Sequence, residues 1–324
     1  MKIWALVLVL LCSSAVAQSG KHKWVLHKKT NPAGAPPSID TFSEEACKVG
    51  HFTPFCQLPY DGPPRDIDKA CGHCGTSDLK GNDLTAEFEQ NFQKTNLCSP
   101  SDAPVLVTIE DLHQLQKQVD GIPGFKYGNI HSGGSGPPLD RSPLKDMKPV
   151  NGKTLHEGMV VRFVGFLAEE HYSPESTSNA GESVNCGAND HPNVDIHMSL
   201  LETATRVPPH ATGAQKEPIL CPSIGAEMIP HFRPEDWEFA QLEHVSDRQV
   251  RLTGQLFFDG SHKPCNVPGH ATTDPKRIAS WEIHPIYAFE VCKKIGGAAC
   301  DPNKDSDWMT MDEATKNMGE NEEP

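Results

Sequence analysis

The sequence lacks the features of several common protein classes. Beyond residue 17 it contains no apolar run long enough to cross a lipid bilayer, so we expect no transmembrane segment. Basic residues are scarce: 29 lysines and arginines stand against 43 aspartates and glutamates, which gives a net charge of −14. A chain this acidic repels phosphate polymers and anionic lipid, and it has no basic run interleaved with aromatic residues. We therefore expect no nucleic-acid partner.

Three catalytic fingerprints are also absent. The chain has no GxSxG motif, so a nucleophile elbow of the α/β-hydrolase kind is disfavoured. It has neither a P-loop nor a dinucleotide-binding fingerprint. The glycine-rich stretch "SGGSGPP" lies in a predicted linker rather than after a strand, so it does not supply one.

The first residues of the sequence predict export. Lys2 is followed by an apolar run from Ile3 to Leu11 and by an A-x-A cleavage pattern at residues 15–17. This is the pattern of a secretory signal peptide, and it is too short to span a bilayer as a stable helix. We expect residues 1–17 to be removed and the mature chain to be periplasmic or extracellular.

An even number of cysteines follows this leader. In an exported chain, ten cysteines predict a disulfide framework of up to five bridges. Five precede residue 100 and five follow residue 185, so at least one bridge must join the two halves if all are oxidised. The sequence leaves the pairing open. The ten residues are Cys47, Cys56, Cys71, Cys74, Cys98, Cys186, Cys221, Cys265, Cys292 and Cys300.

The stretch Cys71-Gly72-His73-Cys74 matches the active-site sequence of disulfide isomerases. Redox chemistry needs an exposed thiol of lowered pKa, usually at a helix start that follows a strand. The preceding "DGPPRDIDKA" is no strand, and Gly75 follows where the isomerases carry a lysine. We interpret both cysteines as members of structural bridges.

Composition and periodicity divide the chain into segments. Within the N-terminal half, "NDLTAEFEQNFQKTN" and "TIEDLHQLQKQV" each place apolar residues on one helical face, and Thr108 with Asp111 fits a capping box. The predicted organisation is a signal peptide (1–17), an extended arm (18–46), a cysteine-rich, partly helical region (47–125), a Pro/Gly linker (126–154), an OB-like β-barrel domain (155–300) and an acidic disordered tail (301–324).

Alternating apolar and polar residues predict strands in the C-terminal half. The expected strands are residues 158–170, 193–202, 225–232, 249–259 and 280–292, with a helix at 233–245 between the third and fourth. This is the element order of the OB-fold, a five-stranded Greek-key barrel. The predicted fold class is therefore mainly β with α: a C-terminal OB-like barrel that follows a cysteine-rich, partly helical region.

Three short motifs place a carboxylate beside a histidine: Asp195-Ile-His197, Asp259-Gly-Ser-His262 and Glu282-Ile-His284. In Asp195-Ile-His197 and Glu282-Ile-His284 the spacing puts both side chains on the polar face of one strand. Imidazole and carboxylate together suit Zn²⁺, Mn²⁺ or Fe²⁺, so we predict a candidate site for a divalent transition metal. The same pairs could instead be a hydrogen-bonded brace. The candidate ligands are Asp195, His197, Asp259, His262, Glu282, His284 and His231.

Two long connections, residues 169–193 and 260–280, flank the predicted barrel mouth. In an OB-fold these are the loops that grip a ligand. Cys186 and Cys265 lie within them and could hold them in place. The loops therefore favour the binding of a small ligand, a glycan or a protein.

The motifs "EGMVVRFVGFL", "ESVNC", "DIHMSLL", "VRLTGQLFFD" and "SWEIHP" resemble those of an uncharacterised family of exported bacterial proteins with an OB-like barrel. The resemblance covers roughly residues 155–292 and, more weakly, "EQNFQKTNLC". That family has no established activity, so the resemblance carries over no functional residue.

Three functions are compatible with this sequence. The first is a secreted or periplasmic, disulfide-stabilised OB-like binding module of unknown ligand. The second is a metal-dependent hydrolase, of phosphoesterase or nuclease-like type, that uses the Asp/Glu–His pairs. The third is a structural envelope protein. Bound metal separates the second from the other two, and stabilisation by a ligand without metal separates the first from the third.

Overall fold

The computed structural model describes part of the chain. The predicted signal peptide and most of the predicted arm, up to residue 41, lie outside the described residues. The described ranges are residues 42–48, 50–56, 62–98, 103–234, 237–265, 274–294 and 299–319. Within these ranges, no helix is long and apolar enough to cross a membrane.

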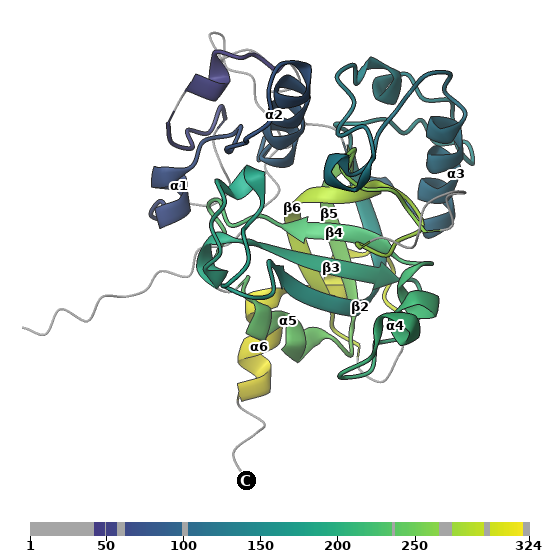
Figure 1. Ribbon diagram of the computed structural model, residues 1–324. Coiled ribbons are helices and arrows are strands. Elements are labelled where there is room, and N and C mark those ends of the chain that lie inside the picture. Colours follow the sequence, from purple (N-terminus) through teal and green to yellow (C-terminus); the bar gives the residue numbers. More distant parts are fainter. Residues whose placement is uncertain are drawn as a thin grey trace, which may run out of the picture.

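Five strands of a seven-stranded sheet close into a ring (Figure 1). Around the ring the order is β2, β3, β4, β6, β5 and back to β2. All neighbours are antiparallel except β4 and β6, which are parallel. The strands are β2 (Val160–Ser173), β3 (Asp195–Leu201), β4 (Ile224–Met228), β5 (Gln249–Phe258) and β6 (Trp281–Cys292). All five predicted strands are present.

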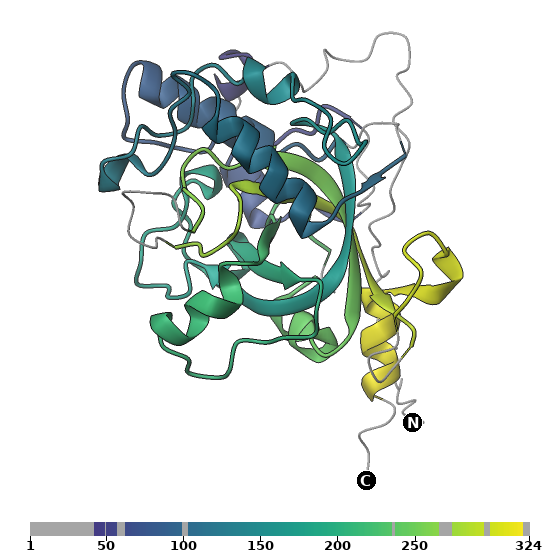
Figure 2. The same cartoon turned by 90° about the vertical axis from the view of Figure 1, so that its right-hand side faces the viewer.

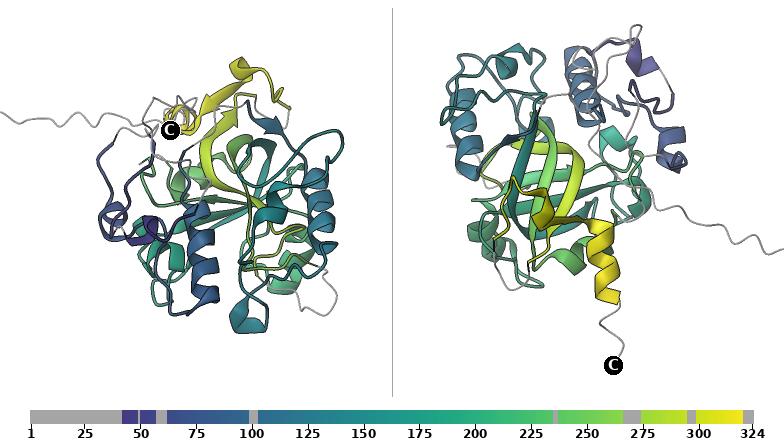
Figure 3. Two further views of the ribbon diagram at one scale, coloured as in Figure 1. Left: turned by 90° about the horizontal axis from the view of Figure 1, so that it is seen from above. Right: turned by 180° about the vertical axis from the view of Figure 1, so that it is seen from behind.

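Helices lie at both ends of this ring. Figures 1, 2 and 3 show α2 and α3 on one side and α5 with α6 on the other. The α-helices are α1 (Asp66–Ala70), α2 (Asn82–Lys94), α3 (Ile109–Asp120), α4 (Gly213–Leu220), α5 (Phe239–Val245) and α6 (Met311–Gly319). Helix α5 begins six residues after the predicted start at residue 233, because Arg233 forms hydrogen bonds to the Val194 and Met228 carbonyls outside any helix.

Short elements complete the sheet and its connections. Strand β1 (Val105–Leu106) pairs in parallel with β2, and β7 (Trp308–Thr310) pairs with β6. The 3₁₀-helices are η1 (Ala46–Lys48), η2 (Ile130–Ser132), η3 (Ser142–Lys145), η4 (Ser183–Asn185), η5 (His191–Asn193) and η6 (Asp305–Asp307).

Strand β2 pairs with two neighbouring strands, and the absence of a side chain at Gly165 allows it to pass from one to the other. Its first half pairs with β5 and its second half with β3, the two pairings meeting at Phe166. A Cβ on Gly165 would lie 2.3 Å from the carbonyl oxygen of Leu201, so no larger residue fits there. The sequence predicted a bulge or bend at Gly165; the register shift itself falls between Leu167 and Glu169.

The predicted alternation of β3 is confirmed, but part of its polar face is covered too. Ile196, Met198 and Leu200 are at most 2% exposed and belong to the main core. On the opposite face Asp195 is also fully buried. The same holds for Gln255 of β5, which donates to the Gln93 and His284 carbonyls. The rest of the chain therefore covers part of the polar face, and the part around His197 and Ser199 stays half-buried.

Two segments are more ordered than predicted. The linker of residues 126–154 is irregular, as expected, yet it packs on the ring, with Leu144 0% exposed and Arg141 hydrogen-bonded to the Phe258 carbonyl. The predicted disordered tail forms β7 and α6 up to residue 319. There, Met311 and Ala314 are buried on one helical face, and α6 packs against α5. A three-residue apolar spacing inside an acidic segment is a weak signal, which explains the wrong prediction.

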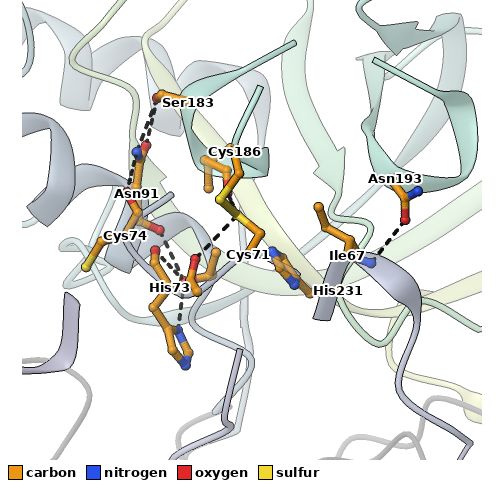
Figure 4. Close-up of a disulfide and its surroundings, with 12 residues drawn as sticks. Ile67, Cys71, His73, Cys74, Asn91, Ser183, Cys186, Asn193 and His231 are labelled. Carbon is orange, nitrogen blue, oxygen red and sulfur yellow. Dashed lines mark hydrogen bonds between the residues drawn. A yellow bond between two sulfur atoms is a disulfide. The ribbon is translucent and has the colours of Figure 1, made fainter. Parts of the chain in front are cut away.

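All ten cysteines form bridges: Cys47–Cys74, Cys56–Cys98, Cys71–Cys186, Cys221–Cys265 and Cys292–Cys300. The Cys71–Cys186 bridge joins the two halves, as the cysteine count predicted (Figure 4). Because Cys71 and Cys74 belong to different bridges, the CGHC motif is structural. His73 is buried between them, where its ring nitrogens contact Thr95 Oγ1 and the Thr53 carbonyl.

Candidate metal centre

The polar faces of β2, β3 and β4 line a cavity of about 830 Å³. Helix α2 supplies another wall with Gln90, Asn91 and Lys94. The first long loop contributes Glu182 and Ser183. Asn91 donates to Ser183 Oγ at 3.2 Å, so the helix and the loop hold one another. The cysteine-rich region therefore packs on the ring and completes the cavity.

A row of ionisable side chains crosses four strands on this side of the sheet. His171 of β2 pairs in register with His197 of β3, and His197 pairs with Glu227 of β4. His284 of β6 continues the row, with its Nδ1 2.8 Å from Glu227 Oε2. Side chains at paired positions leave the same face of a sheet, so strand register brings these four residues together.

Two groups of potential ligand atoms lie along this row. The first comprises Glu182, Asp195, His197 and Glu227, whose ligand atoms all lie within 4.8 Å of one another. The second comprises Glu227, Glu282 and His284, and it meets the same distance limit. Glu227 belongs to both groups. Two predicted pairs, one from β3 and one from β6, are thus joined by a glutamate from β4.

Close ionic contacts define the first group. His197 Nε2 lies 2.9 Å from Glu182 Oε1 and 3.5 Å from Glu227 Oε1. Ser173 donates its hydroxyl to Glu182 Oε1 at 2.6 Å. Lys94 Nζ lies 3.2 Å from Glu182 Oε2 and 3.6 Å from Glu227 Oε2. The ammonium group and the imidazole therefore share the same two glutamates.

These contacts shift the pKa values of the group strongly. Burial opposes charge, but Glu227 and Glu182 outweigh it and raise the pKa of His197 to about 10. For His284, Glu227 likewise overcomes burial and raises the pKa to about 9. Despite burial, Lys94 and His197 hold the pKa of Glu182 well below its usual range. Protonated His197 and His284 and the ammonium group of Lys94 therefore balance the carboxylates.

Asp195 differs from Glu182 and Glu227, which form ion pairs, because it forms none with the described residues. It is 0% exposed, and neither carboxylate oxygen has a hydrogen-bond partner among the described residues. Burial, together with the negative charges of Glu182 and Glu227, raises the pKa of Asp195 to about 7. Buried polar groups are nearly always hydrogen-bonded, so the carboxylate of Asp195, which lies among three other potential ligands, is a candidate cation ligand.

No family model, curated protein or solved structure matches this chain. The chemistry of the site is therefore inferred from its own geometry. Asp259 and His262, the second predicted pair, line the same cavity but belong to neither ligand group. His262 Nδ1 lies 2.7 Å from Asp259 Oδ2, and Arg277 bridges Asp259 to Glu282 by hydrogen bonds to both.

His231 lies outside the candidate site, contrary to the prediction. Its Nδ1 is 2.9 Å from Asp68 Oδ1 of α1, and its ring stacks on Phe52 with the centroids 4.6 Å apart. His231 thus helps to hold the cysteine-rich region against the ring (Figure 4). It follows β4 by three residues, beyond the regular alternation, so strand periodicity could not place its side chain.

Sequence reasoning missed four residues of the site. Glu227 lies between the core residues Ala226 and Met228, so alternation alone could have placed it on the polar face. His171 lies just beyond the predicted end of its strand, which continues to Ser173. For Lys94 and Glu182 no local signal exists, because each reaches the site through the packing of distant segments.

Proposed function

We propose that this protein is an exported, disulfide-stabilised module built on an OB-like barrel, and that its cavity binds a divalent transition-metal ion. The strand order of the ring, the parallel β4–β6 pair and helix α5 between β4 and β5 support the OB-like assignment. Five bridges support an oxidising compartment, as expected of an exported chain. The proposed ligands are Glu182, Asp195, His197 and Glu227.

The buried, unpaired carboxylate of Asp195 carries this proposal. A metal ion within bonding distance of Asp195 would supply the partner that the described residues do not. One imidazole and three carboxylates suit Zn²⁺, Mn²⁺ or Fe²⁺. His284 would then hydrogen-bond a ligand rather than bind the ion itself, because its Nδ1 contacts Glu227 and would orient that carboxylate toward the ion.

Metal content of the oxidised protein tests the proposal. The protein would be purified without a histidine tag and without chelator, and its metals measured by mass spectrometry. We expect about one equivalent of a transition metal, which His197→Ala and Asp195→Asn abolish. We also expect chelation to lower the melting temperature, because an ion bound to the native state stabilises it. Absence of metal in a folded protein that also takes up none on addition would refute the proposal.

The cavity is larger than a metal ion needs, which favours a bound molecule as well. Its volume of about 830 Å³ is within the usual range for small-molecule sites. Hydroxyl, amide and carboxylate groups line it, including those of Ser199, Asn91 and Glu169. This lining suits a polar ligand such as a glycan. A glycan array read with and without chelator would show whether such a ligand needs the metal.

A metal-dependent hydrolase is the second candidate, and the Asp259–His262 pair favours it. An imidazole oriented by a carboxylate beside a metal site is the arrangement of a general acid or base. We would assay p-nitrophenyl phosphate, bis(p-nitrophenyl) phosphate and p-nitrophenyl acetate with the metal-loaded protein. A hydrolase predicts turnover that His262→Ala abolishes while metal content is unchanged. No turnover of the three esters would leave the binding function alone.

A further inference from the structure

His171 is a second imidazole in the row that carries the proposed metal ligands. It lies directly opposite His197 in the antiparallel β2–β3 pair, and both line the cavity. Directly opposed residues have their Cβ atoms roughly 5 Å apart on one face of the sheet. The pair is therefore fixed by two regular strands rather than by a loop.

The separation of the two rings is compatible with shared coordination, although His171 belongs to neither group of ligand atoms that lie within 4.8 Å of one another. The ring centroids of His171 and His197 are 5.4 Å apart, with the planes inclined by 56°. Two imidazoles on one tetrahedral ion, with metal–nitrogen bonds of roughly 2 Å, hold their ring centres roughly 5 Å apart. An ion between the two rings would also face Glu182 and Glu227, because both carboxylates contact His197.

We propose that His171 is a metal ligand, so that the centre contains two imidazoles from adjacent strands together with carboxylates from Glu182, Glu227 and Asp195. This inference rests on the proposed metal-binding function. It also selects the class of ion. Imidazole suits Zn²⁺, Fe²⁺, Ni²⁺ and Cu²⁺, so a second imidazole favours these ions over Mn²⁺, whereas Mg²⁺ and Ca²⁺ prefer oxygen ligands alone. The site therefore takes late transition-metal ions and discriminates against Mg²⁺ and Ca²⁺.

Pulsed electron paramagnetic resonance of the Cu²⁺-loaded wild-type protein counts the imidazoles directly. The remote nitrogen of each coordinated imidazole modulates the spin echo, and combination lines appear when two rings bind one ion. We expect two imidazoles. A count of one would overturn the role of His171 and leave the metal-binding proposal standing. A wild-type protein that binds neither Cu²⁺ nor Zn²⁺ would overturn both.

Variants provide a second readout. Zn²⁺ affinity would be measured by competition with a chromophoric chelator for the wild type, His171→Ala and His131→Ala. His131 is a matched control because it lines the same cavity but lies outside the strand row. We expect His171→Ala to weaken Zn²⁺ binding at least tenfold, and His131→Ala to leave it unchanged. Equal affinities in all three folded proteins would refute the inference.

Discussion

Two buried carboxylates with different surroundings provide the sharpest test of the site. Asp195 is 0% exposed and Glu157 is 2% exposed. Arg141 donates its Nε–H to Glu157 Oε2 at 3.0 Å and a second hydrogen bond to Oε1, whereas Asp195 has no hydrogen-bond partner among the described residues. The substitutions Asp195→Asn and Glu157→Gln change each carboxylate to an amide of the same size. We expect them to change stability in opposite directions.

The size of each stability change depends on whether the substitution leaves a buried partner of the carboxylate unpaired. Removing one partner of a buried ion pair destabilises a protein by about 3–5 kcal/mol, so Glu157→Gln should lower the free energy of unfolding by that amount. Asp195 has no partner to lose. Replacing its unpaired charge with a neutral amide should raise the free energy of unfolding of the metal-free protein by about 1–3 kcal/mol.

The pH dependence gives this expectation a sign. The pKa of Asp195 is raised from 3.8 to about 7, so the folded state holds its proton more tightly than the unfolded state. Asp195 therefore reduces stability increasingly as the pH rises from about 4 through 7. The stabilisation by Asp195→Asn should be largest at pH 8 and should vanish near pH 4.

Urea unfolding with the bridges intact and with chelator present measures these changes. The free energies would be compared at pH 8 and pH 4 for the wild type and both variants, with the urea dependence checked for constancy. If Asp195→Asn destabilises the metal-free protein at pH 8 as Glu157→Gln does, Asp195 is a structural brace. The interpretation of its unpaired oxygens as a metal-binding feature would then be wrong.

Three further outcomes are expected. Replacing both cysteines of Cys71–Cys186 by alanine should lower stability by about 5 kcal/mol, against about 2.5 kcal/mol for Cys292–Cys300, because the bridged residues are 115 and 8 positions apart; equal losses in urea unfolding would contradict this. Burial lowers the pKa of His73 to about 3, below its value of 6.5 when exposed, so stability falls as the pH drops below 7. His73→Gln should remove about 2 kcal/mol of the loss between pH 7 and pH 5, and unchanged unfolding curves would show that His73 does not titrate. Lys94→Met should raise Zn²⁺ affinity in chelator competition, because the ammonium group occupies the two glutamates that would bind the ion; weaker binding would show that Lys94 supports the centre.

Local sequence patterns predicted helices and strands well where apolar periodicity or a capping motif was clear. The apolar faces of α2 and α3 and the capping box of Thr108 with Asp111 were read from neighbours a few residues apart. The alternation in β3 assigned each residue to a face correctly. Cysteine parity required one bridge between the halves, and Cys71–Cys186 is that bridge. These features depend on short-range geometry or on counting, which the sequence contains in full.

The site depended on relations that short-range patterns do not contain. The two-residue alternation of a strand predicts the face of the sheet on which His197 lies. Only the strand register places His171 and Glu227 beside it. Glu182 and Lys94 come within 3.2 Å of one another although they are 88 residues apart in sequence. Periodicity likewise gave no reason for part of the polar face of the ring to be buried, because the cysteine-rich region and the ordered tail cover it. Short-range patterns in the sequence predicted the five ring strands, α2 and α3, and the residue types available for chemistry. Ring closure and long-range packing decided which of those groups meet, and they also ordered β7 and α6.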